Sequence, residues 1–245
     1  MARAKQKSTD PGGLQLEQLQ QMAAAGEEIL EIYRVLEKAG SNVVAEVLRH
    51  QGTFYQWNHY PPGDSVDWET HSQYYFHAHP QDQRGGEHGH FHCFMRYDGI
   101  AAGARPVALE TPQADNEDRI GCHLVAISMD KAGFPVGLFT TNRWVTDETW
   151  YGAADVGEML NDFLIDHTHP SWATNRWLSA MFRLFSADIS ALAEDRDAAV
   201  AARMSENPGS DVYEDRGLEI TSHRAISVTE KITAVHRALK EKRAS

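Results

Sequence analysis

Cysteine is scarce in this chain. The 245 residues contain only two cysteines, Cys93 and Cys122, and neither forms part of a CxxC motif. Such a pair excludes a disulfide framework and a zinc site built from cysteines. Two reduced thiols are the simpler interpretation, although one disulfide between them is left open. We therefore expect apolar side chains to stabilise the fold, and a chain of this length buries enough surface to form a sizeable core.

Basic charge and long apolar runs are also lacking. Lys and Arg number 23 against 35 Asp and Glu, so the net charge is −12. An acidic chain without a basic stripe is a poor candidate for binding nucleic acid. No stretch approaches the roughly 18 apolar residues of a membrane span, and residues 1–13 contain no apolar segment of a secretory signal. These absences predict a cytoplasmic protein with neither nucleic acid nor membrane as a partner, and they leave the oligomeric state open.

Motifs for nucleotide binding and for a serine nucleophile are missing as well. The chain has no GxGxxG, no GxxxxGK[ST] and no GxSxG. Apolar residues recur at helical spacing in the N-terminal part of the chain, several strand patterns follow, and helical spacing returns in the C-terminal part. This order predicts an α+β fold with a central antiparallel sheet and helices packed on it. The expected organisation is a flexible tail over 1–13 and a single domain over 14–245, which is helical over 14–52, β-rich over 53–146 and mainly helical over 153–243.

Local signals place the individual elements. Apolar residues at helical spacing predict a helix that ends near Gly40, and Ser41 is positioned to cap a short second helix. Residues 120–129 and 134–145 are typical of two strands of a hairpin, with His123, Val125 and Ile127 expected on one face. Ser171 and Ser227 are positioned to cap helices, and residues 218–222 add one strand. Residues 99–118 form a long loop that we expect to be the least ordered internal segment.

The most informative stretch is 74–96, which holds five of the 13 histidines. His77 and His79 form one HxH run, and His88, His90 and His92 form an HxHxH run. Residues two apart on a strand share a face, and the intervening loop contains turn residues, so the stretch predicts a hairpin with its imidazoles on one side. If His79 lies opposite His88, then His77 faces His90 and Tyr75 faces His92. A register slip of one residue would send one set of histidines to the other face.

Clustered imidazoles favour a metal site, because histidine is the commonest side-chain ligand of metals. Three histidines with an open position are typical of catalytic zinc, and two histidines with a carboxylate are typical of a mononuclear iron oxygenase. We therefore predict a divalent transition metal, Zn or Fe, bound by His77, His79, His88, His90 and His92 in an oxygenase-type or hydrolase-type enzyme that acts on a small molecule. The alternatives are a non-catalytic metal-binding or sensing protein, and a structural protein with incidental histidines.

Glu87 is the predicted catalytic residue, because a carboxylate beside such a cluster acts as a general base or as a further ligand. Asp82 and Glu69 are the other carboxylate candidates. His123 is interpreted as a core or edge histidine. His167 and His169 form another HxH beside a helix end, where their side chains point in different directions, and their role is left open.

Residues 53–73 are rich in aromatic side chains and contain a turn sequence, Pro61-Pro62-Gly63-Asp64. Five of these residues either line a pocket or cover one end of the sheet, namely Tyr55, Trp57, His59, Tyr60 and Trp68.

Two family resemblances follow from these motifs. The HxH run with a nearby Glu and Gly resembles the metal motif of the cupins, which are small metal-binding barrels. The spacing to Glu87 is longer than in cupins, and Thr140 stands where the later cupin histidine would be. The EHGHFHxF motif, residues 123–146 and the PSWATNRW segment resemble an uncharacterised bacterial family, a domain of unknown function. This second resemblance covers most of the chain and implies no activity.

Overall fold

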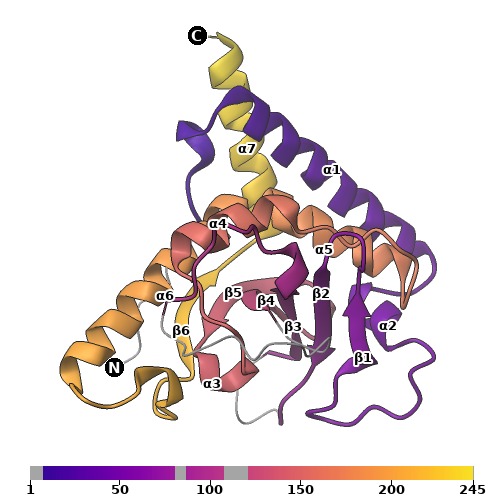
Figure 1. The fold of residues 1–245 in the computed structure, drawn as a ribbon. Helices are drawn as coiled ribbons and strands as arrows, with labels where there is room; N and C mark the ends of the chain where they lie inside the picture. The colour runs from indigo at the N-terminus through magenta and orange to yellow at the C-terminus, as the bar shows by residue number, and fades with distance from the viewer. Residues whose placement is uncertain (1–7, 81–86, 108–120, 245) are drawn as a thin grey trace.

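A six-stranded antiparallel sheet forms the centre of the structure (Figure 1). The computed structural model describes residues 8–80, 87–107 and 121–244. Each strand pairs with the next one along the chain, so β1 and β6 are the edges of the sheet. The strands are β1 (Tyr60–Val66), β2 (Ser72–His77), β3 (Gly89–Met95), β4 (Cys122–Met129), β5 (Pro135–Thr141) and β6 (Ile220–Ala225).

Helices precede and follow the first five strands, which confirms the predicted α+β class. Figure 1 shows α1 and α7 together at the top, with α5 and α6 between them and the sheet. The helices are α1 (Leu16–Lys38), α2 (Val43–Leu48), α3 (Arg143–Thr146), α4 (Ala153–Asp162), α5 (Trp172–Leu184), α6 (Ser186–Glu206) and α7 (Val228–Ala244), with short 3-10 helices at Pro11–Gly13, Tyr97–Gly99 and Val212–Glu214.

Most of the predicted helix caps are present. The Ser171 side chain accepts a hydrogen bond from the Thr174 N–H at the start of α5, and the Ser227 side chain accepts one from the Glu230 N–H at the start of α7. The cap predicted at Ser41 is wrong. Asn42 is the N-cap of α2, because its side-chain oxygen accepts the Ala45 N–H at 2.9 Å, one residue further along the chain.

One face of the sheet packs against the helices. Tyr74 of β2 and Phe91 of β3 point to this side, where the Tyr74 hydroxyl bonds to Asn175 of α5 at 2.5 Å and the Phe91 ring lies 5.6 Å from that of Trp177. Cys93 alternates with its neighbours onto the same face and is fully buried in the apolar core, as predicted. Because side chains alternate along a strand, residues 75, 77, 90 and 92 point to the opposite face.

The predicted turn at Pro61-Pro62-Gly63-Asp64 is wrong, because these residues lie within strand β1. The register against β2 shifts between Tyr60 and Ser65, and Gly63 and Asp64 take positive φ angles of 79° and 61°. Prolines lack a backbone donor, so a strand can accept them at a sheet edge or a bulge. β1 provides both, and it therefore accommodates a sequence that is otherwise typical of a turn.

Some predictions concern residues outside the described ranges. These include residues 1–7 of the predicted tail, the hairpin loop 81–86 with Asp82, and residues 108–118 of the predicted long loop.

Residues 8–13 contact the folded chain: the Ser8 hydroxyl and the Thr9 N–H both donate to Asp188 of α6. Pro106 forms an isolated bridge with Tyr151.

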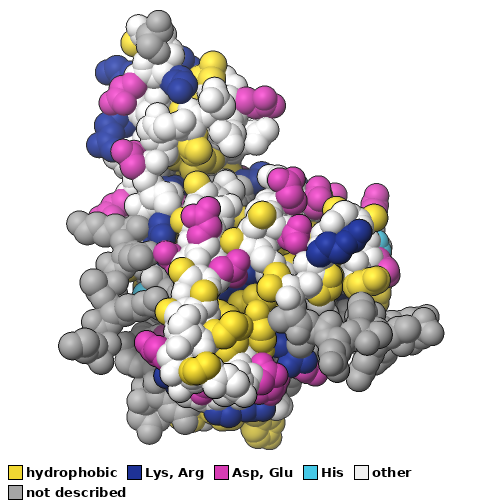
Figure 2. Space-filling view, turned by 60° about the vertical axis from the view of Figure 1, so that its left-hand side comes forward, with side chains coloured by type: hydrophobic (Ala, Val, Ile, Leu, Met, Phe, Trp, Pro, Cys, Tyr) yellow, Lys and Arg dark blue, Asp and Glu magenta, His cyan; other side chains and the backbone are white. Residues whose placement is uncertain are grey.

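The described surface carries both charged and hydrophobic side chains. Figure 2 shows acidic and basic side chains interspersed over one face of the molecule. Among the described residues, no helix is long and apolar enough to cross a bilayer.

A buried ion pair joins the N-terminal segment to α6 and α7. The Lys231 ammonium lies 2.6 Å from the Asp188 carboxylate, and both side chains are almost completely buried. Lys231 also donates to the carbonyl oxygen of Thr9 at 2.9 Å. Arg224 lies 4.0 Å from Asp188, so removal of Lys231 leaves Asp188 with this longer ion pair. Weakening a buried pair is more costly than breaking a pair on the surface.

We expect Lys231→Met to lower the free energy of unfolding by roughly 3 kcal/mol, because Asp188 loses its close cation. Denaturant unfolding of the parent and the variant measures this difference. Arg34→Met is the matched control, since the Arg34–Glu31 pair is exposed and an exposed pair contributes about 0–1 kcal/mol. Equal losses in the two variants would contradict this assignment.

Candidate metal centre

The pairing of β2 with β3 positions the histidines. Tyr75 lies opposite His92 and His77 lies opposite His90, as predicted from the alternation. The pairing of β2 with β3 ends at His77 and His90, so the expected His79–His88 pairing falls beyond the two strands. Gly89 allows the strands to approach here, because a Cβ atom at this position would lie 2.7 Å from the His77 carbonyl oxygen.

Three of the five predicted ligands lie close together. His77, His79 and His90 each offer a ring nitrogen, and these three atoms all lie within 4.8 Å of one another. The Nε2 atoms of His77 and His90 are 2.7 Å apart. His90 is fully buried, whereas His77 and His79 are half-buried. We call His77, His79 and His90 the histidine triad, and these three residues could hold a metal ion.

A carboxylate supports the buried member of the triad. Glu87 Oε1 lies 2.5 Å from His90 Nδ1, and the Ser128 hydroxyl of β4 donates to Glu87 Oε2 at 2.6 Å. Because an ionised carboxylate only accepts hydrogen bonds, His90 Nδ1 carries the hydrogen and Nε2 offers its lone pair. Metal-binding histidines commonly show this arrangement, in which a carboxylate orients the ring through the nitrogen that does not bind the ion.

His123 extends the cluster on the same side of the sheet. Its Nε2 lies 2.9 Å from Nδ1 of His92, and both rings are buried. The expectation that His123 shares a face with Val125 and Ile127 is wrong. The β3–β4 register shifts so that Cys93 pairs with Val125 but Phe94 pairs with His123. The extra residue, Leu124, turns His123 to the histidine face, as a β-bulge does.

Burial keeps the His123 imidazole neutral. Desolvation, with Arg196 and His90 nearby, lowers its pKa to about 3. The pairing with His92 satisfies one ring nitrogen, and the Thr141 hydroxyl lies 3.4 Å from the other. A buried imidazole in this setting accepts and donates hydrogen bonds without introducing a charge.

Glu148 is a buried carboxyl group that the sequence did not reveal. The backbone N–H of His123 donates to its Oε2 at 2.6 Å, and the Thr146 hydroxyl donates to its Oε1 at 3.2 Å. Burial raises its pKa to about 7, although Arg196 and these hydrogen bonds act in the opposite direction. No spacing motif contains Glu148, so only the fold identifies it as a neighbour of the histidine face.

Other candidates lie outside the triad. His88 precedes β3 and is exposed, with its backbone N–H bonded to Met129. His167 and His169 lie before α5, where the Asn175 side chain donates to both of their carbonyl oxygens. Glu69 is exposed in the turn before β2, at the opposite end of that strand from His77.

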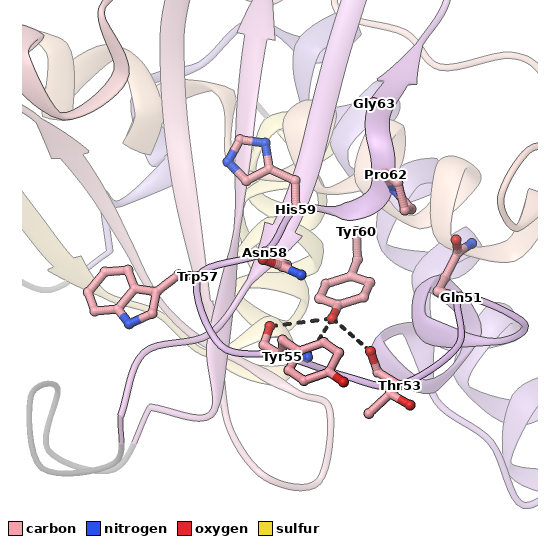
Figure 3. A pocket seen from close by; sticks show the side chains of 9 residues that line it. All are labelled: Gln51, Thr53, Tyr55, Trp57, Asn58, His59, Tyr60, Pro62 and Gly63. Atoms are coloured by element: carbon pink, nitrogen blue, oxygen red, sulfur yellow. Dashed lines mark hydrogen bonds between the residues drawn. The ribbon is translucent and has the colours of Figure 1, made fainter.

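Beside the triad lies a hollow of about 610 Å³, formed by the segment that leads into β1 (Figure 3). Four of the five aromatic residues expected in a pocket line it, namely Tyr55, Trp57, His59 and Tyr60. The Trp57 ring packs edge-on against His79 at 4.2 Å, so the hollow borders the triad. Trp68 lies elsewhere, over the Arg96 guanidinium at 4.7 Å.

The fold and the site define an α+β protein with a histidine cluster on the sheet face that points away from α5. The chain belongs to the family described as "Domain of unknown function (DUF6969)", whose model matches residues 23–226. This match confirms the resemblance to an uncharacterised family, and the matching model is not that of the cupins. Neither the comparison with curated proteins nor that with solved structures gave a match.

The raised pKa of Glu148 predicts a pH dependence of stability. The folded protein keeps this proton up to about pH 7, whereas an ordinary glutamate loses it near pH 4.5. The contribution of Glu148 is therefore complete below pH 4.5 and is lost as the pH rises through 7. Between pH 5 and pH 8, we expect the parent to lose about 2–3 kcal/mol relative to Glu148→Gln, which cannot ionise.

Denaturant unfolding at both pH values measures this difference. The exposed Glu37→Gln variant is the control and should follow the parent at both. Parallel pH profiles of the parent and Glu148→Gln would show that the carboxyl group does not titrate in this range.

Proposed function

We propose that this protein is a metal-dependent enzyme that acts on a small molecule, with Zn²⁺ or Fe²⁺ bound by the histidine triad. The observation that carries this proposal is the convergence of three imidazole nitrogens within 4.8 Å. Like groups gain little packing energy from such an arrangement, whereas three nitrogen ligands suit either ion.

The surroundings of the triad support the same conclusion. Glu87 accepts the Nδ1 hydrogen of His90 and thereby directs the His90 Nε2 lone pair toward His77. Ser128 holds the carboxylate in place. His92 remains a predicted ligand, since its ring lies 4.7 Å from that of His90 and 5.2 Å from that of His77. His88 was also predicted as a ligand, but it is exposed and precedes β3, so we leave it out of the proposed ligand set.

Three histidine ligands leave coordination positions open for water or substrate. A bound divalent ion in such a site acts as a Lewis acid and lowers the pKa of bound water. The chain itself excludes water from the inner side of the site, because His90, His92 and His123 are buried. The half-buried His77 and His79 form the side from which a substrate would approach.

The role of Glu87 as a general base stays a prediction. Each of its carboxylate oxygens has a hydrogen-bond partner, His90 on one and Ser128 on the other. These contacts favour a positioning role, in which Glu87 holds the tautomer and orientation of His90. A base role requires one of these bonds to open during the reaction.

The proposal is tested by His90→Ala and His88→Ala. The first variant removes a histidine of the triad, and the second removes a nearby histidine outside it. We expect the parent, purified without a histidine tag or a nickel column, to bind one ion, and His90→Ala to lose it. His88→Ala should bind like the parent. At free metal about 100 times its dissociation constant, the ion should stabilise the parent by about 2.7 kcal/mol, a rise in melting temperature of roughly 5–10 °C.

Elemental analysis and melting curves with and without chelator measure these effects. A parent that contains no metal and shows no shift with any divalent ion would overturn the proposal. Equal metal loss in both variants would contradict the assignment of the triad. An ion that binds with all its coordination positions filled by protein would favour the storage or sensing alternative over catalysis.

A further inference from the structure

We infer that the molecule recognised beside the histidine triad is neutral and carries hydroxyl groups. In this inference it binds in the hollow of residues 51–63 and donates a hydroxyl hydrogen to Nε2 of His59. This inference rests on the proposed function, because it names the class of substrate on which the metal centre would act.

His59 is held in one orientation by two contacts. Asp64 Oδ1 lies 2.9 Å from its Nδ1, and its ring stacks on that of Tyr75 with centroids 3.5 Å apart and planes within 7°. Tyr75 belongs to the histidine face, opposite His92. The ring centroid of His59 is 6.0 Å from that of His77. His59 is therefore fixed at the border between the hollow and the triad.

A buried network holds Asp64 in turn. The Gln73 side-chain amide donates to Asp64 Oδ2 at 2.7 Å, and the Arg96 guanidinium donates to the Gln73 amide oxygen at 2.8 Å. Gln73 and Arg96 are both buried. Each oxygen of Asp64 thus has a defined partner, and the carboxylate orients a ring that is itself partly exposed, at 42% of its side chain.

This arrangement determines what His59 offers to a ligand. In the neutral form of the ring, the Asp64 carboxylate accepts a hydrogen bond from Nδ1, and Nε2 then offers a lone pair. Nε2 therefore accepts a hydrogen bond from a ligand, and a hydroxyl group is a neutral donor suited to it. The imidazole is already oriented, so little side-chain entropy is lost on binding.

The other walls of the hollow favour a neutral ligand as well. Its nine lining residues include no Lys, Arg, Asp or Glu. Gln51, Thr53 and Asn58 contribute amide and hydroxyl side chains, which both donate and accept hydrogen bonds. Figure 3 shows the Tyr60 hydroxyl bonded to the backbone of Thr53 and Tyr55 at the centre of this segment. A charged ligand would gain no ion pair from these lining side chains.

Trp57 supplies a flat wall. Its side chain is 53% exposed although it packs on His79. Its φ angle is +71°, which is unusual for a bulky residue, and its backbone N–H bonds to the Ala78 carbonyl oxygen at 3.1 Å. Strain of this kind is often retained where a side chain has a binding role. The exposed ring suits the apolar face of a hydroxylated ring compound.

Saturation-transfer NMR with myo-inositol and glucose tests the inference, with gluconate and glucosamine as charged analogues. We expect the neutral probes to bind the parent more tightly than the charged ones. His59→Phe keeps the ring stack but removes the acceptor, and Trp57→Ala removes the wall; each should weaken binding at least tenfold. Asp64→Asn should weaken it as well, because an amide can donate to Nδ1 and move the ring hydrogen to Nε2. The exposed His236→Phe and Trp172→Ala are the controls and should bind like the parent.

The measurements are made on both chelated and zinc-loaded protein, which separates this inference from the proposed function. His59→Phe and Trp57→Ala should keep the metal content and melting temperature of the parent while losing the probes. The inference is overturned if neither neutral probe binds in either state, if the charged analogues bind as tightly, or if His59→Phe and Trp57→Ala bind like the controls. A parent that takes up no metal ion but still binds the neutral probes through His59 would contradict the metal proposal alone.

Discussion

The antiparallel pairing of β2 with β3 is the constraint on which the histidine face depends. Side chains alternate along a strand, so the register that pairs His77 with His90 sends Tyr74 and Phe91 into the core. A slip of one residue would turn the imidazoles toward α5 and the apolar residues toward the histidine face instead. The packing of the Phe91 ring on Trp177 therefore stabilises the site as well as the core. The position of the histidine face is a consequence of how the opposite face packs.

Crowded imidazoles are tolerated on this sheet because they are hydrogen-bonded, and because burial disfavours a charge on His123. Glu87 accepts a hydrogen bond from His90 Nδ1, and the rings of His92 and His123 are hydrogen-bonded to each other. Burial holds the pKa of His123 far below its usual range, so no repulsion between cations arises there. Neutral imidazoles are also the form that binds a metal ion. The same physical condition therefore permits the cluster to fold and prepares it to act as a ligand set.

Local sequence patterns predicted those helices and strand pairs that depend on short-range periodicity or on a capping residue. The helix of apolar residues before Gly40, the caps at Ser171 and Ser227 and the pairing of His77 with His90 all follow from short-range periodicity or capping. Strand β1 was missed, because two prolines and a glycine indicate a turn when read locally. Only its position at the sheet edge, where a missing donor is tolerated, makes that sequence compatible with a strand.

By itself, the sequence determined the α+β class and the grouping of His77 and His90, because alternation along two adjacent strands requires no long-range information. The tertiary structure alone decided which other groups join them. The register shift at Leu124 brings His123 to His92 across 31 residues, and the chain past β5 carries Glu148 beneath His123. The Asp64 carboxylate, which lies where the register of β1 shifts, contacts His59. Such contacts depend on bulges and burial, which arise when distant segments pack, and no local spacing encodes them.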